Sequence, residues 1–285
     1  MKHHIRDFLT LAAFLFLVVV SIPLAWASQG HKDAPEYSFG VVPQFEQRKL
    51  FRIWRPILDE LEKRTGLSFH LVGSPKIPVF EKKYMAGIYD FAYMNPYNIL
   101  QAYKSQGYIP LIRDGGRVLK GVLVVRKDSP IQSMKELAGK QVAFPARNAL
   151  GASLMIRADL DRLHVVEIIP RYVQTHSSVY LHVAMGMTEA GGGVVSTLRA
   201  QKPEIQNRLR VLYETQAVNP HPVSVHPRVP LEDQEKVRRA FLAMAQSKEG
   251  AALLSKIPMR KAIAASMDDY SFMSTMGLEA FYIEE

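Results

Sequence analysis

The sequence contains no cysteine, and this absence removes several kinds of chemistry at once. Disulfides, thiolate metal sites and cysteine nucleophiles are all excluded. Lipid attachment of the bacterial lipoprotein kind is excluded as well, because it needs a cysteine. The 285 residues are 48% hydrophobic and 22% charged, a composition typical of a folded globular protein.

Sequence patterns of catalytic and metal sites are also missing. The chain has no Gly-x-Ser-x-Gly elbow, no Walker phosphate loop and no His-Glu-x-x-His motif. His221 and His226 lie in a proline-rich segment without a partner at metal-ligand spacing. We therefore expect no cofactor and no metal, and we expect a binding protein rather than an enzyme.

Acidic residues are fewer than basic residues, and the formal net charge is +9. A basic balance can indicate nucleic acid or another anionic partner. Here the basic residues are scattered, with Lys82–Lys83 and Arg238–Arg239 as the notable pairs beyond the N-terminus. We therefore expect no nucleic-acid partner and infer only a modest preference for an anionic ligand.

The N-terminal residues have the pattern of a secretory signal peptide. Lys2 and Arg6 precede an apolar run from Phe8 to Leu24, and Ala25–Trp26–Ala27 is a small-x-small cleavage pattern. This predicts a signal peptide over residues 1–27 and a periplasmic protein, which we expect to act as a monomer. Because the apolar run is somewhat long, an uncleaved membrane anchor is the alternative.

Beyond the signal, short apolar runs alternate with segments of helical periodicity. Strands are expected at 37–42, 68–72, 90–94 and 109–112, and a second alternation follows the apolar run at 121–125. Such alternation favours mostly parallel sheets flanked by helices. Val223–Val225, bounded by three prolines, is expected at an edge or a crossover. The pattern predicts an α/β protein of two lobes, residues 36–120 plus 222–285 and residues 121–221, joined by two hinge crossings.

Polar side chains follow the expected strand ends, where ligands of open α/β sheets bind. These positions gather hydroxyls, amides, glycines, a histidine and an arginine but few carboxylates, which suits a small polar anion better than acid–base catalysis. The candidate ligand-binding residues are Gln44, Tyr93, Asn95, Tyr97, Arg147, Asn148, Ala149, His176, Ser177 and Gly193.

The segment from Gln141 to Leu154 is predicted to form a strand, a tight turn and a helix start capped by Asn148. A helix N-terminus offers unpaired N–H groups and the positive end of the dipole, and Arg147 adds a charge beside it. We therefore expect an anion seat here, and expect Arg147→Ala to weaken binding at least about tenfold.

Structural roles for several of these residues stay open. Arg147 can be a solvated surface side chain, and Asn95 can serve mainly as the cap of the helix that starts at Pro96. His176 can be a satisfied structural histidine. Gly191–Gly193 can permit close packing or can present N–H groups to an anion.

Over about residues 36–280, the chain resembles the periplasmic phosphate-, phosphite- and phosphonate-binding proteins of ABC importers. The order and spacing of five segments carry the resemblance: 54–66, 90–97, 135–140, 176–178 and 190–194. The resemblance implies a type II periplasmic-binding fold that closes on an oxyanion. It also implies an anion site formed by Ala146–Ala149, an aromatic side chain from 93–97, and His176.

The chain departs from this family at one informative place. The family's run of serine and threonine at the helix start is replaced by Ala146, Arg147, Asn148 and Ala149. The ligand can therefore be an anion other than phosphonate. The leading hypothesis is a periplasmic protein that delivers a small oxyanion to an ABC-transporter permease. The alternatives are a sensor that docks on a membrane histidine kinase and, third, an enzyme on the same scaffold.

Overall fold

The computed structural model describes residues 35–164 and 167–283. The predicted signal peptide at residues 1–27 lies outside these ranges. Within them, no helix combines the length and the hydropathy needed to cross a bilayer.

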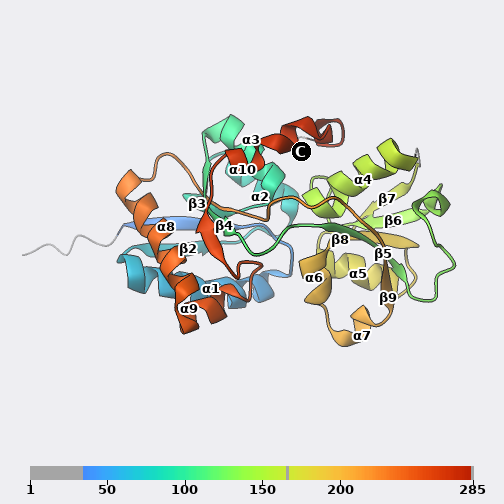
Figure 1. Ribbon diagram of the computed structural model, residues 1–285, viewed down its shortest axis with the longest axis horizontal. Coiled ribbons are helices and arrows are strands. Elements are labelled where there is room, and N and C mark those ends of the chain that lie inside the picture. Colours follow the sequence, from blue (N-terminus) through green and yellow to red (C-terminus); the bar gives the residue numbers. More distant parts are fainter. Residues whose placement is uncertain (1–34, 165–166, 284–285) are drawn as a thin grey trace, which may run out of the picture. The chain divides into compact units, whose positions relative to one another are not determined.

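Six strands form the first sheet, in the spatial order β11–β4–β10–β3–β1–β2 (Figure 1). β1 pairs in parallel with β2 and β3, whereas β10 runs antiparallel between β3 and β4, and β11 runs antiparallel to β4. The strands are β1 (Glu36–Val41), β2 (Ser68–Val72), β3 (Phe91–Tyr93), β4 (Ile109–Asp114), β10 (Val223–Val225) and β11 (Ala262–Ala264).

β10 corrects one sequence-based expectation. We expected Val223–Val225 at an edge or a crossover. The strand directly follows the second connection between the two sheets, which agrees with a crossover, but it pairs on both sides and so does not lie at an edge. The reason is that Pro220, Pro222 and Pro227 all lie outside the strand, so its three residues keep their backbone N–H groups. β10 and β11 run opposite to β1, β2, β3 and β4, so the sheet is mixed while most of its strands share one direction, as expected.

Helices cover both faces of this sheet. α1 (Gln47–Thr65), α8 (Leu231–Gln246) and α9 (Lys248–Leu254) lie on one face, and α2 (Ile77–Met85) and α3 (Pro96–Gln106) lie on the other (Figure 1). The apolar stripe of α1, from Leu50 to Leu61, is buried, and Gly66 ends the helix at φ 70°. The C-terminal tail is helical, with α10 (Asp268–Ser271) followed by 3₁₀ turns at Phe272–Thr275 and Leu278–Ala280.

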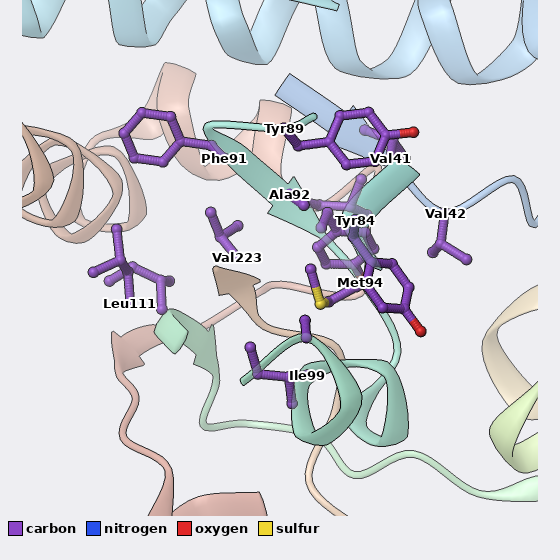
Figure 2. Close-up of a cluster of buried hydrophobic side chains, with 14 of the residues drawn as sticks. Val41, Val42, Tyr84, Tyr89, Phe91, Ala92, Met94, Ile99, Leu111 and Val223 are labelled. Carbon is purple, nitrogen blue, oxygen red and sulfur yellow. The ribbon is translucent and has the colours of Figure 1, made fainter. Parts of the chain in front are cut away.

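The core of the first sheet contains side chains from both of its faces and from the helices above it. Figure 2 shows Val223 of β10 near Phe91 and Leu111, with Met94 and Ile99 nearby. All five side chains are at most 1% exposed. The central place of β10 in this sheet therefore rests on apolar packing as well as on backbone pairing.

Five strands form the second sheet, in the order β7–β6–β8–β5–β9. β6 is parallel to β7 and β8, whereas β5 is antiparallel to β8 and β9, so this sheet is mixed too. The strands are β5 (Gly121–Arg126), β6 (Gln141–Phe144), β7 (Ile169–Tyr172), β8 (Ala190–Val194) and β9 (Leu209–Glu214).

A continuous helical segment, residues 150–164, lies on one face of the second sheet and includes α4 (Met155–Asp159). α5 (His176–Ala184) lies on the opposite face (Figure 1). The shorter helices are α6 (Val195–Arg199) and α7 (Pro203–Gln206), with a 3₁₀ turn at Met134–Leu137.

Two stretches of chain connect the sheets, between β4 and β5 and between β9 and β10. They pair with each other, because Leu119 and Val218 exchange two backbone hydrogen bonds of 2.8 and 2.9 Å. These are the two expected crossings. The lobe boundaries proposed from the sequence stay predictions.

Candidate functional site

A small cavity of about 20 Å³ is lined by residues from loops and helix starts that follow strands of both sheets. This volume is of the order that holds one water molecule. The lining residues are Val42, Gln44, Ile77, Asn95, Leu119, Ala149, Leu150, Gly151, Ala152, His176, Val194 and His221. None of these twelve carries a fixed charge, so amides, imidazoles and backbone groups supply the polarity.

The helix start at residues 149–152 contributes backbone to the cavity wall. The first turn is wide, with Ser153 N and Leu154 N donating to Ala149 O at 2.7 and 3.1 Å. The preceding N–H groups belong to the first turn of a helix, where intrahelical acceptors are missing and the dipole is positive. Wide turns of this kind are frequent at functional sites.

Glycines of the second sheet allow this helix start to rest directly on the strands. A Cβ atom at Gly192 would lie 1.9 Å from Ala152 O, and one at Gly121 would lie 2.0 Å from Gly151 O. The glycine run was expected to follow a strand, but it forms the strand β8 itself. These glycines therefore permit close packing, and they determine how near the backbone of residues 151–152 lies to the strands of the second sheet.

His176 is the first residue of α5 and is 3% exposed. Thr175 caps the helix by accepting from Ser178 N, and Thr197 Oγ1 lies 3.1 Å from His176 Nδ1. Thr197 is itself 2.8 Å from the hydroxyl of Tyr180, which fixes the imidazole through a buried network. Burial lowers the pKa of His176 to about 4, so the imidazole is neutral near pH 7.

His221 is the functional candidate that sequence reasoning missed. Its ring stacks on Tyr93, with centroids 5.3 Å apart, and its Nε2 lies 3.2 Å from Nε2 of Gln44. The imidazole is 5% exposed, and burial, with His176 as the second cause, lowers its pKa to about 3. Its place in a proline-rich segment gave no local signal, because Gln44 is 177 residues away in the sequence.

Four of the ten sequence-predicted site residues line the cavity: Gln44, Asn95, Ala149 and His176. Asn95 also caps α3 as expected, with Oδ1 accepting from Tyr97 N and Asn98 N at 2.9 and 2.8 Å. Asn95 thus combines a structural role with a position at the cavity.

The other six predicted residues lie outside the lining. Tyr93 lies behind His221, Tyr97 packs on Tyr282 with ring centroids 5.4 Å apart, and the side chain of Ser177 is 3.4 Å from Gln201 Nε2. Gly193 faces Tyr180, whose hydroxyl would lie 2.0 Å from an added Cβ.

The two polar residues of the predicted anion seat also have other contacts. Arg147 is exposed, and its guanidinium lies 4.8 Å from the ring centroid of Tyr172. Asn148 does not cap the helix: its amide donates to Glu81 Oε2 and Ile283 O and accepts from Ile283 N. Asn148 therefore joins this turn to α2 and to the C-terminal segment.

Residues 39–270 match the family of phosphonate-binding periplasmic substrate-binding proteins of ABC transporters. The chain belongs to this family. Its members are periplasmic binding proteins that take up small ligands for ABC transporters, so the resemblance inferred from the sequence is confirmed. No curated protein sequence matches the chain.

Several solved structures share the fold of this chain. A binding protein component of an ABC phosphonate transporter from Pseudomonas aeruginosa has a TM-score of 0.76 at 16% identity, covering 86% of both chains. PhnD1 from Prochlorococcus marinus, in complex with methylphosphonate, has a TM-score of 0.78 at 15% identity, covering 87% of this chain and 99% of its own. A Xanthomonas citri protein bound to chloride has a TM-score of 0.71 at 16% identity, covering 86% of this chain and 98% of its own. The expected two-sheet fold is therefore confirmed.

Proposed function

We propose that this family member binds a small phosphorus oxyanion in the cavity and delivers it to the permease of an ABC importer. The observation that carries the proposal is the convergence of the helix start at Ala149–Ala152 with two buried imidazoles and two side-chain amides. A helix N-terminus is a ready anion site, and neutral donors around it can bind the remaining oxygens.

The apolar part of the lining indicates which oxyanions fit. The side chains of Val42, Ile77 and Leu119 form an apolar part of the lining, in contrast to the polar amides and imidazoles. A phosphite hydrogen or a phosphonate methyl group can face this wall without losing hydrogen bonds, whereas a fourth oxygen of phosphate cannot. The small volume also favours the smallest ligands, and entry of any of them requires the cavity to widen.

Isothermal titration calorimetry against phosphite, methylphosphonate, phosphate and sulfate tests this proposal. We expect binding of at least one phosphorus oxyanion, with phosphite and methylphosphonate tighter than phosphate. Absence of binding across the whole panel would refute the oxyanion function. Mass spectrometry of small molecules that co-purify with the protein gives an independent readout of the ligand.

A matched pair of variants at Ala149 tests the position of the anion. Ala149→Asp and Ala149→Asn add side chains of nearly equal size at the cavity wall, and both are good residues at a helix N-cap. Only Asp adds a negative charge, which would repel an anion in a poorly solvated cavity. We expect Ala149→Asp to bind at least tenfold more weakly than Ala149→Asn, and equal affinities would place the anion elsewhere.

Docking on a permease follows from the family. The sensor role, the monomeric state and the signal peptide stay predictions, since no contact of the described residues tests them.

A further inference from the structure

The cavity has a property that conflicts with a doubly charged ligand: its twelve lining residues include no lysine and no arginine. A helix N-terminus supplies only about half an elementary charge. Burying a dianion against so little positive charge is costly, because the surrounding protein solvates charge poorly. Some group in the lining must therefore become positive, or the ligand must enter with a proton. Two side chains of the lining, His176 and His221, can carry that proton.

Hydrogen bonds fix the backbone on both sides of His221, whose imidazole ring lines the cavity. Pro220 O accepts a 3.0 Å hydrogen bond from Tyr270, and Pro222 O accepts a 3.3 Å bond from Met94 N. With both flanking carbonyls fixed and the ring stacked on Tyr93, His221 has little freedom to turn away. This rigidity is typical of a positioned ligand group rather than a surface histidine.

We propose that His221 is a second ligand-binding imidazole and that the His176–His221 pair takes up one proton as the oxyanion enters. The inference rests on the proposed function and deepens it by naming the charge state that the site selects. Phosphite and methylphosphonate can share a proton with the pair in the neutral pH range. Sulfate is a far weaker base than these dianions and cannot share the proton, so the site discriminates against it.

The electrostatic surroundings favour one proton on the pair rather than two. His221 lies against Gln44 and Tyr93 and close enough to His176 for their charges to interact, and the charge of Asp114 acts on Tyr93. Two imidazolium rings in one small cavity would repel each other, so the pair titrates as a unit.

His176, on the other wall, is bonded to Thr197, and Thr197 is in turn bonded to Tyr180. Without a ligand, burial keeps both rings neutral, as their lowered pKa values indicate. A bound anion stabilises a protonated imidazole, so it favours the imidazolium form over the neutral form of the ring.

The Gln44 amide can form a hydrogen bond with His221 in both protonation states of the ring. In the structure the Gln44 amide nitrogen faces Nε2 of His221 at 3.2 Å, which suits a neutral ring that accepts a hydrogen bond. A protonated ring needs an acceptor at the same place. Rotation of the Gln44 amide by half a turn supplies its oxygen, so the same contact serves both states.

Calorimetry in buffers of different ionisation enthalpy measures the proton uptake directly. At pH 8 we expect about one proton taken up per phosphite bound, with affinity falling about tenfold per pH unit above this point. Sulfate is expected to bind at least tenfold more weakly than phosphite. Phosphite binding without proton uptake would overturn this inference while leaving the proposed function intact, whereas absence of all oxyanion binding would refute the proposed function.

His221→Gln and a matched control separate the histidine from the ligand as the carrier of the proton. In His221→Gln we expect at least tenfold weaker phosphite binding at pH 8 and less than half the proton uptake. His182→Gln, on the same helix as His176 but outside the lining, should leave both unchanged. Unchanged uptake and affinity in His221→Gln would overturn the inference.

If His221→Gln does not fold, nitrogen-15 spectra of histidine-labelled wild-type protein decide. Phosphite is then expected to move the ring nitrogens of one member of the pair to imidazolium shifts. Neutral shifts for both rings in the complex would overturn the inference.

Discussion

The imidazole of His221 lies against the phenol ring of Tyr93, with centroids 5.3 Å apart and planes 24° from parallel. The Tyr93 hydroxyl is buried and has no hydrogen-bond partner among the described residues. Tyr93 therefore supports His221 through its ring. A tyrosine that binds ligand would instead use its hydroxyl group.

Tyr93→Phe tests this division of roles. The stacking surface is retained and an unsatisfied hydroxyl is removed, so we expect a free energy of unfolding unchanged or raised by up to about 1 kcal/mol. Ligand affinity should change less than about threefold, as measured by calorimetry. A tenfold loss of affinity with normal stability would instead make the hydroxyl a ligand contact, as expected from the sequence.

A substitution at Gly193 tests whether this glycine is needed for packing or for contact with the ligand. A Cβ at this position would lie 2.0 Å from the Tyr180 hydroxyl, so Gly193→Ala should lower the free energy of unfolding by about 1–3 kcal/mol. Gly116→Ala is the control, because its added Cβ would have no atom nearer than 3.3 Å. Chemical denaturation should give the same loss for Gly193→Ala with and without phosphite. A loss confined to the ligand-bound protein would contradict the packing role.

Local sequence signals predicted the parts of the site that depend on neighbouring residues. Asn95 followed by Pro96 forms the predicted helix cap, and the strand-to-helix turn before Ala149 is where the pattern placed it. His176 was found because it follows a predicted strand end. Each of these positions is set by backbone rules that operate within a few residues.

The remainder depends on contacts between distant segments, which local patterns do not contain. His221 reaches the cavity because β10 lies inside the first sheet and because Gln44 and Tyr93 meet its ring. Asn148 was expected as a cap because asparagine favours that position, but its amide instead bonds to Glu81 and to the C-terminal segment. Tertiary partners outcompeted the local preference there.

Arg147 is the residue for which the sequence and the geometry make different predictions. Its guanidinium lies over Tyr172, outside the cavity lining, so we expect Arg147→Ala to weaken binding by less than about threefold. Arg147→Lys retains the charge and serves as the matched variant. A loss of about tenfold in Arg147→Ala but not in Arg147→Lys would support the charge-based role that the sequence suggested. Calorimetry with phosphite at low ionic strength is the appropriate measurement, because salt screens an exposed charge.

Asn148 is expected to matter for stability rather than for binding. Its amide makes bonds of 2.9 Å to Glu81 and 2.7 Å to Ile283 O, and it accepts from Ile283 N at 3.0 Å. Asn148→Ala removes all three and leaves the buried Glu81 carboxylate and two backbone groups of Ile283 without these partners, which should lower the free energy of unfolding by about 2–3 kcal/mol. Asn207→Ala, at an exposed position, should cost less than about 0.5 kcal/mol. A binding defect in Asn148→Ala at normal stability would contradict this assignment.

The two buried histidines make stability depend on pH in a defined direction. In the folded protein burial lowers the pKa of His176 to about 4 and that of His221 to about 3, whereas an unfolded chain protonates histidine near its ordinary value of 6.5. The unfolded state therefore binds protons first, and the free energy of unfolding falls as pH drops from about 6.5 towards 4. The loss is on the order of 2–3 kcal/mol for each histidine by pH 4.

Urea denaturation of the ligand-free protein between pH 7.5 and pH 4 measures this dependence, and variants assign it. His176→Gln should make the dependence on pH shallower without abolishing it, because Gln takes up no proton in either state while His221 still does. The comparison uses slopes rather than absolute stabilities, so a constant loss of packing in the variant does not affect it. Equal slopes in wild type and His176→Gln would mean that the His176 imidazole gains its proton as readily in the folded protein as in the unfolded chain.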